Sequence, residues 1–102
     1  MTQPALQRAA DGVYRLSGAL VFGTVPELYE RFMAEAPGTP EVIVDLQEVT
    51  RADSAGLALL VEWLRVVRNR NGTVRFLNIP PQLQAMIRVT GLERAFSQPP
   101  GP

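Results

Sequence analysis

A long amphipathic pattern between two β-branched segments constrains this fold more than any other feature of the sequence. From Ser54 to about residue 71, apolar residues recur at helical spacing and form one stripe: Leu57, Leu60, Val61, Leu64 and Val67. The run at residues 42–46 suits a strand buried on both faces, and residues 73–77 suit a second strand. After the first strand we expect a short loop at residues 47–53. Strand, helix and strand in this order predict a right-handed parallel crossover.

The remaining patterns complete an α/β fold. Residues 13–17 and 19–22 predict two short strands around a turn at Ser17-Gly18. Thr24 and Glu27 form a capping box that opens a helix, and a last helix ends at Gly91 as a left-handed cap. The predicted order is β-β-α-β-α-β-α, a sandwich in which helices pack on a mixed four-stranded sheet.

Length and hydropathy indicate one domain without a membrane span. The chain has 102 residues and 46% apolar residues, enough for a single core. We expect a loose N-terminus at residues 1–11, a domain at residues 12–96 and a disordered tail at residues 97–102. The opening residues lack the apolar stretch of a signal peptide, and the longest apolar run spans residues 55–61. This is far below the roughly 20 residues of a membrane helix, so we expect a cytoplasmic protein with no direct membrane insertion.

Composition removes most catalytic chemistry. All ten basic residues are arginines, and lysine, histidine and cysteine are absent. The chain therefore has no thiolate nucleophile, imidazole base or Schiff-base lysine, and we expect a non-enzymatic protein without cofactor. Asp45 and Asp53 alone make a poor cation site, so no metal is expected. Arg65, Arg68 and Arg70 lack an accompanying aromatic platform, which favours a solvated helix face over a nucleic-acid surface.

The residues that open the long helix are the candidate site. Asp53 and Ser54 stand where a buried strand leads into the helix, and ligands of α/β sheets tend to lie at such places. Unpaired N–H groups at a helix N-terminus favour an anion, so we expect a favourable field for a phosphate on Ser54. Ala55 and Gly56 keep the first turn narrow and would let a partner approach. The alternative is that Asp53 and Ser54 only cap the helix.

A second candidate surface lies on the same helix. Leu59 and Trp63 fall outside the core stripe and widen the apolar arc. Trp63 is a typical interface anchor, which predicts a partner surface on the N-terminal half of this helix. The alternative is that the last helix or the C-terminal segment covers both residues.

Three sequence motifs together resemble the STAS domain family of sulfate transporters and anti-sigma-factor antagonists. They are a hydrophobic strand ending in Asp45-Leu46, the stretch from Asp53 to Leu57 that opens a helix, and the closing pattern from Met86 to Leu92. The resemblance covers residues 12–96. In the antagonist branch, the serine matching Ser54 is phosphorylated by a partner kinase, which switches binding off. This chain departs from that branch at Ala55 and at residues 18–22.

Residues 18–28 and 53–60 are more similar to the small cytoplasmic STAS subunit of the Mla phospholipid transporter. That resemblance implies a non-enzymatic subunit that binds the ATPase of an ABC transporter and, through it, the permease complex. Such a subunit supports ATPase assembly and activity and helps maintain outer-membrane lipid asymmetry, peripheral to the inner membrane. The contact residues expected on this basis are Asp53, Ser54, Ala55, Gly56, Leu59 and Trp63. The alternative function is an anti-sigma-factor antagonist switched by phosphorylation of Ser54.

Overall fold

A computed structural model describes residues 5–9, 12–35 and 41–97. Its elements follow in the order β1 (Ala5–Arg8), β2 (Tyr14–Leu20), α1 (Val25–Glu35), β3 (Glu41–Ala52), α2 (Ser54–Asn69), β4 (Thr73–Leu77), α3 (Pro81–Val89) and α4 (Glu93–Ser97). The strands form one mixed sheet in the order β1-β2-β3-β4. The first pair is antiparallel and the other two are parallel, which confirms the α/β fold with a mixed four-stranded sheet.

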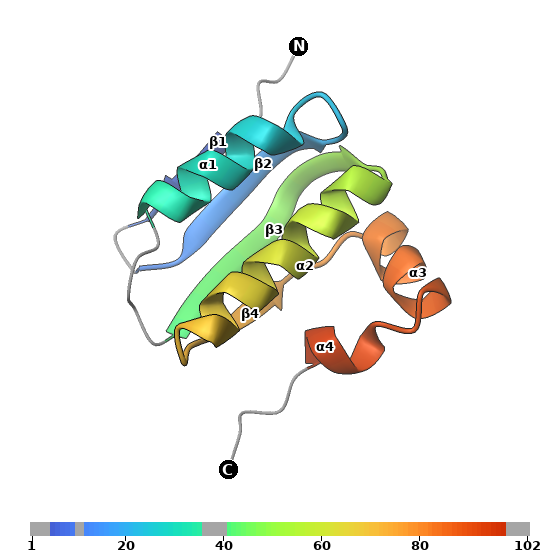
Figure 1. The fold of residues 1–102 in the computed structure, drawn as a ribbon. Coiled ribbons are helices and arrows are strands. Elements are labelled where there is room, and N and C mark those ends of the chain that lie inside the picture. The colour runs from blue at the N-terminus through green and yellow to red at the C-terminus, as the bar shows by residue number, and fades with distance from the viewer. Residues whose placement is uncertain (1–4, 10–11, 36–40, 98–102) are drawn as a thin grey trace.

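The helices form a single layer against the sheet. In Figure 1, α1 and α2 lie side by side in front of the strands, and α3 and α4 follow beyond the β4 side of α2. In β3, Val42, Val44 and Leu46 are buried, whereas Ile43 and Asp45 between them are only half-buried. The expectation that this strand is buried on both faces is therefore wrong. A β-branched run is also compatible with a strand that has one covered face and one partly exposed face.

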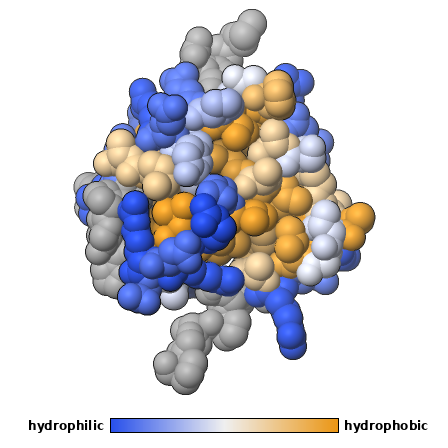
Figure 2. Space-filling view, in the orientation of Figure 1, coloured by the Kyte–Doolittle hydropathy of each residue, from blue (hydrophilic) through white to orange (hydrophobic). Residues whose placement is uncertain are grey.

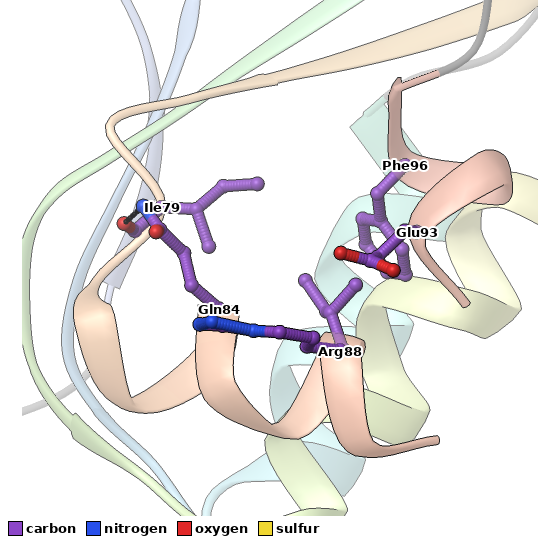
Figure 3. Close-up of a pocket in the computed structure, with 6 residues that line it drawn as sticks. Ile79, Gln84, Arg88, Glu93 and Phe96 are labelled. Carbon is purple, nitrogen blue, oxygen red and sulfur yellow. Dashed lines mark hydrogen bonds between the residues drawn. The ribbon is translucent and has the colours of Figure 1, made fainter. Parts of the chain in front are cut away.

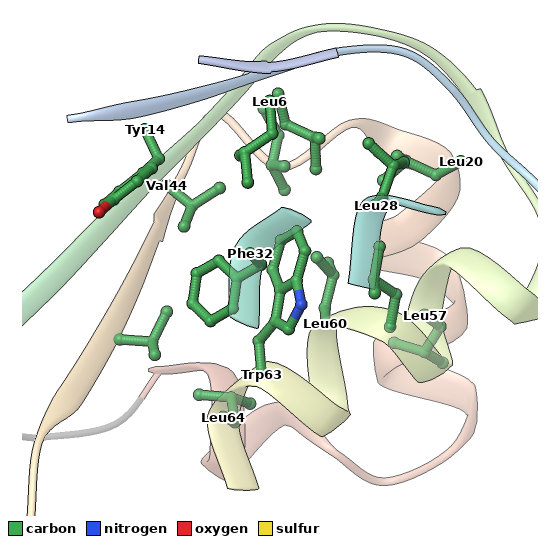
Figure 4. Close-up of a cluster of buried hydrophobic side chains, with 14 of the residues drawn as sticks. Leu6, Tyr14, Leu20, Leu28, Phe32, Val44, Leu57, Leu60, Trp63 and Leu64 are labelled. Atoms are coloured by element: carbon green, nitrogen blue, oxygen red, sulfur yellow. The ribbon is translucent and has the colours of Figure 1, made fainter. Parts of the chain in front are cut away.

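The core is centred on an aromatic pair between the two long helices. Trp63 of α2 is 0% exposed and stacks on Phe32 of α1, with ring centroids 4.3 Å apart and planes at 21° (Figure 4). Such offset stacking adds to the free energy that burial alone supplies. The indole Nε1 of Trp63 has no hydrogen-bond partner among the described residues. Packing of α1 on α2 thus depends on shape and apolar area.

The N-terminal part of the sheet differs from the predicted hairpin. The expectation of a loose segment at residues 5–8 is wrong, because these residues form β1. The Leu6 side chain attaches this strand to the core, where it is only 1% exposed. The two strands expected around Ser17-Gly18 are a single strand, β2. Gly18 has a φ of +88°, and the register with β3 shifts between Gly18 and Ala19. A glycine of this kind marks an irregularity within a strand as readily as a turn.

Two further boundaries were misjudged. The expected loop at residues 47–53 is mostly strand, because β3 continues to Ala52 and pairs with β2 as far as Leu20. Gly91 has a φ of +75°, which confirms the left-handed cap, but the chain then forms α4. The tail predicted from residue 97 lies, from residue 98 on, outside the described residues. Within the part of the chain that the structure describes, no helix is both long and apolar enough to cross a bilayer.

Candidate partner-binding site

Asp53 joins the start of α2 to the loop between β2 and α1. Its Oδ1 accepts hydrogen bonds from the backbone N–H groups of Ala55, at 2.8 Å, and Gly56, at 3.4 Å. Its Oδ2 accepts a third from the N–H of Phe22 at 3.3 Å. Asp53 is therefore the N-cap of α2, as the alternative interpretation of the sequence held. It also fixes the position of the loop that carries Phe22.

Gly56 serves packing within the molecule. A Cβ atom placed on Gly56 would lie 2.6 Å from the backbone oxygen of Leu20 and 2.9 Å from its Cβ. Only glycine lets α2 approach the end of β2 this closely. The expectation that Gly56 opens the backbone to a partner is wrong, because Leu20 already occupies that space and Gly56 is buried. Ala55 beside it is half-buried.

Ser54 is exposed beside an apolar groove between α2 and α3. The groove has a volume of about 310 Å³ and is lined by Ser54, Leu57, Ala85, Met86, Val89 and Thr90. Its exposed walls are entirely apolar. Among the described residues, the Ser54 side chain has no hydrogen-bond partner. A free hydroxyl thus stands at the rim of a surface that water solvates poorly.

Two exposed apolar side chains flank Ser54. Phe22 is 83% exposed and Val89 is 86% exposed. The loop of Phe22 is held by Thr24, whose Oγ1 donates to the carbonyl of Ala19 at 2.7 Å and accepts from the N–H of Val21 at 3.0 Å. Figure 2 shows apolar surface over the N-terminal half of α2 and over α3. We call this surface the docking face; it comprises Phe22, Ser54, Leu57, Ala85, Met86 and Val89.

Sequence reasoning missed Phe22 and Val89 and chose Leu59 and Trp63 instead. Those two are 2% and 0% exposed, so the prediction that they contact a partner is wrong. The first predicted helix, not the last, provides the cover, since Phe32 of α1 stacks on Trp63. Val89 did carry a signal, because it lies off the stripe that buries Leu83 and Ile87 in α3.

Two of the other hollows, each larger than about 400 Å³, do not include Ser54 in their lining. One, of about 430 Å³, lies among Ile79, Gln84, Ile87, Arg88, Glu93 and Phe96 (Figure 3). The Gln84 side chain there donates from Nε2 to the Ile79 carbonyl at 2.8 Å, so it fixes the turn before α3. The other, of about 450 Å³, lies between α1 and α2 and has Tyr29, Glu30 and Glu62 on its border. No group of three or more acidic side chains in the described ranges could hold a metal ion.

Asp45, the other carboxylate considered, belongs to a structural cluster. Its Oδ1 accepts from Nδ2 of Asn78 at 3.0 Å and from the N–H of Gln47 at 2.9 Å. Chiefly the Asn78 hydrogen bond, and then the Gln47 one, lowers the pKa of Asp45, and Arg15 at 4.0 Å adds a smaller effect. The cluster ties β3 to the turn after β4.

Comparison with known proteins decides the family. A family model described as "Mlab, STAS domain" matches residues 5–98. The anti-sigma-B factor antagonist of Staphylococcus aureus is 30% identical over 80 residues, which are 78% of this chain and 74% of that protein. The chain belongs to the STAS domain family. This STAS domain is also 38% identical over 61 residues to Glutaminase 2 of Bradyrhizobium diazoefficiens, of which it covers only 10%.

Solved structures agree with the fold of this STAS domain. An anti-sigma factor antagonist from Mycobacterium paratuberculosis has a TM-score of 0.72 and 26% identity, covering 96% of this chain and 85% of that one. Unphosphorylated SpoIIAA, an anti-sigma factor antagonist, has a TM-score of 0.71 and 20% identity, covering 91% and 84%. The resemblance to the STAS domain family is confirmed, and the matched residues 5–98 include β1, which lies outside the expected domain of residues 12–96.

Proposed function

We propose that this STAS domain is a non-enzymatic regulatory module that binds a partner protein through the docking face and is switched by phosphorylation of Ser54. In this function it is an anti-sigma-factor antagonist. The observation that carries the proposal is the unpartnered Ser54 hydroxyl at the rim of the apolar groove. A kinase can reach this hydroxyl, and any partner seated on the groove must cover it.

The surroundings of Ser54 explain how a phosphate would act. The N–H groups of Ala55 and Gly56, which would otherwise attract an anion, already donate to Asp53. A phosphate adds about −1.5 to −2 charges, beside the Asp53 carboxylate and the groove. We therefore revise the expectation of a favourable field for phosphate. The added charge raises the cost of burying the docking face, and the partner is released.

The relatives support the same function. The Staphylococcus aureus protein is named an anti-sigma-B factor antagonist, and SpoIIAA has been solved in unphosphorylated and phosphorylated forms. The departure at Ala55 removes a neighbouring hydroxyl but leaves the one at Ser54.

The test is phosphorylation by the cognate anti-sigma kinase and ATP. We expect the intact protein to gain the mass of one phosphate and to lose affinity for the kinase. Ser54→Ala should abolish the mass gain, whereas Ser17→Ala, at a half-buried serine of β2, should retain it. Incorporation of phosphate into Ser54→Ala at the wild-type rate would contradict the proposal.

A second function is favoured by the description of the matching family model as "Mlab, STAS domain". In that function, the docking face binds the ATPase of an ABC phospholipid transporter in the cytoplasm, peripheral to the inner membrane, and Ser54 is an unmodified contact. Ser54→Arg should abolish co-purification with the ATPase and permease while the domain keeps its helical circular dichroism. Recovery of the same complex with Ser54→Arg would count against this function, and recovery of a kinase would favour the first.

A further inference from the structure

The hollow between α3 and α4 combines an apolar lining with two opposite charges. Its apolar lining consists of Ile79, Ile87 and Phe96, of which Ile87 is only 5% exposed. Arg88 of α3 and Glu93 of α4 also line this hollow (Figure 3). Among the described residues, neither charged side chain has a hydrogen-bond or ion-pair partner. The hollow therefore presents a guanidinium, a carboxylate and apolar surface to the same ligand.

The turn between the two helices fixes the direction in which α4 leaves α3. Gly91 has a φ of +75°, and the N–H of Leu92 donates to the carbonyl of Ile87 at 3.0 Å. These are the features of a left-handed helix cap, which satisfies the last carbonyls of α3 and reverses the chain. Arg88 precedes this turn and Glu93 follows it, so the turn places the two charges on different walls of the hollow.

Both walls are also attached to the rest of the molecule. In α4, the carbonyl of Ala95 accepts a hydrogen bond from Nη2 of Arg68 in α2 at 3.3 Å. The ring of Phe96 packs against Phe76 of β4, with ring centroids 5.5 Å apart. On the other wall, the hydrogen bond from the Gln84 side chain fixes the turn before α3. A ligand thus meets walls that are already in place, which reduces the entropy lost on binding.

The ligand that matches this lining carries a carboxylate, an ammonium and an apolar side chain. The guanidinium of Arg88 can donate two parallel hydrogen bonds to a carboxylate, and the carboxylate of Glu93 can accept from an ammonium. Contact of the apolar side chain with Ile79, Ile87 and Phe96 removes apolar surface from water. The volume of about 430 Å³ suits a small molecule of this kind. An inorganic anion or a purely apolar molecule would use only part of the lining.

We propose that the hollow between α3 and α4 binds a free α-amino acid with a large apolar side chain, held between Arg88 and Glu93. None of the residues that line this hollow belongs to the docking face. The site therefore does not depend on which partner protein the docking face binds. Because the ligand contacts α3 and α4 together, its binding also stabilises the folded domain by mass action.

Titration of the full chain with L-leucine, followed by nuclear magnetic resonance of the backbone amides, tests the proposal. We expect a dissociation constant of about 1–10 mM, with the largest shifts at Ile79, Arg88 and Phe96. Three matched compounds each lack one part of leucine. L-Leucinamide lacks the carboxylate, 4-methylpentanoate lacks the ammonium and glycine lacks the apolar side chain. Each should bind at least about fivefold more weakly than leucine.

Variants of the two charged residues assign the contacts. Both residues are exposed, so their substitution should leave the core intact. Arg88→Gln should remove the preference for leucine over leucinamide, and Glu93→Gln should remove the preference for leucine over 4-methylpentanoate. Arg94→Gln, at an exposed residue of α4 that does not line the hollow, is the control and should keep both preferences.

Three outcomes would overturn the proposal. They are the absence of any shift up to about 50 mM leucine, shifts confined to the docking face, and equal affinities of the wild type for leucine and leucinamide. Ser54→Ala should bind leucine as the wild type does. A failure of the phosphorylation switch is therefore distinguishable from a failure of the amino-acid site.

Discussion

Adjacent residues at the start of α2 do different work. Asp53 accepts three backbone hydrogen bonds and determines how the loop and helix meet. Ser54, next to it, makes no side-chain hydrogen bond within the described residues and stays available to a partner. Gly56 packs inside the molecule against Leu20. The sequence pattern locates these three residues but does not show which of them caps the helix, which contacts a partner and which serves packing. The same residue types are used for all three roles.

Gly56→Ala tests the packing role at residue scale. Alanine would gain about 1 kcal/mol in helix propensity, but its Cβ would meet the Leu20 backbone oxygen at 2.6 Å. Overpacking against backbone costs more than that gain, so we expect a net loss of about 1–2 kcal/mol in the free energy of unfolding. Urea denaturation measures it. The matched control is Gly23→Ala, where no atom lies within 4 Å of the added Cβ and the change should stay within about 0.5 kcal/mol.

At the scale of elements, the spacing of apolar residues predicted α2, β4 and the parallel crossover that they form with β3. Each of these elements buries one uninterrupted set of apolar side chains. The N-terminal strands were misread because Leu6 alone is buried in β1, which leaves no alternation to detect. The end of β3 carries no strand pattern in the sequence, because its polar residues face water while its backbone pairs with β2. The partner surface was misplaced for a related reason. A helix pattern alone cannot tell which neighbouring helix covers Trp63.

The link between β3 and the turn after β4 predicts a pH effect. Asn78→Gly keeps the positive φ of +56° but removes the amide that donates to Asp45. We expect the pKa of Asp45 to rise towards its ordinary value, as followed by nuclear magnetic resonance of its carboxyl carbon. Asn71→Gly, at a second asparagine of positive φ, +63°, should leave that pKa unchanged.

The effect on stability has a definite sign. The pKa of Asp45 is lowered in the folded state, so its contribution is complete above the unfolded pKa and disappears as pH falls through the folded one. The free energy of unfolding of the wild type should therefore exceed that of Asn78→Gly at neutral pH. This difference should shrink as the pH falls from about 5 to about 2. A stability difference that is constant over this interval would show that the hydrogen bond does not act on ionised Asp45.

At the scale of the whole molecule, one layer of helices covers a sheet whose first strand is part of the core. Leu6→Ala should therefore lower the free energy of unfolding by about 3 kcal/mol, because it leaves a cavity under α1. Gln7→Ala, at the exposed neighbouring position of the same strand, should change it by less than about 0.5 kcal/mol. Equal, small effects of both substitutions in thermal or urea unfolding would mean that β1 is not part of the cooperative unit.

The hydrogen bonds from Phe22 and from the first turn of α2 to one carboxylate have a consequence for binding speed. They join the loop and the helix into one surface, although 31 residues separate Phe22 from Asp53. A surface that is already in its bound shape loses little conformational entropy when a second protein arrives. Association can then proceed without waiting for a rearrangement, and affinity is governed by how long the two molecules stay together. A charge placed at Ser54 would therefore act first on residence time.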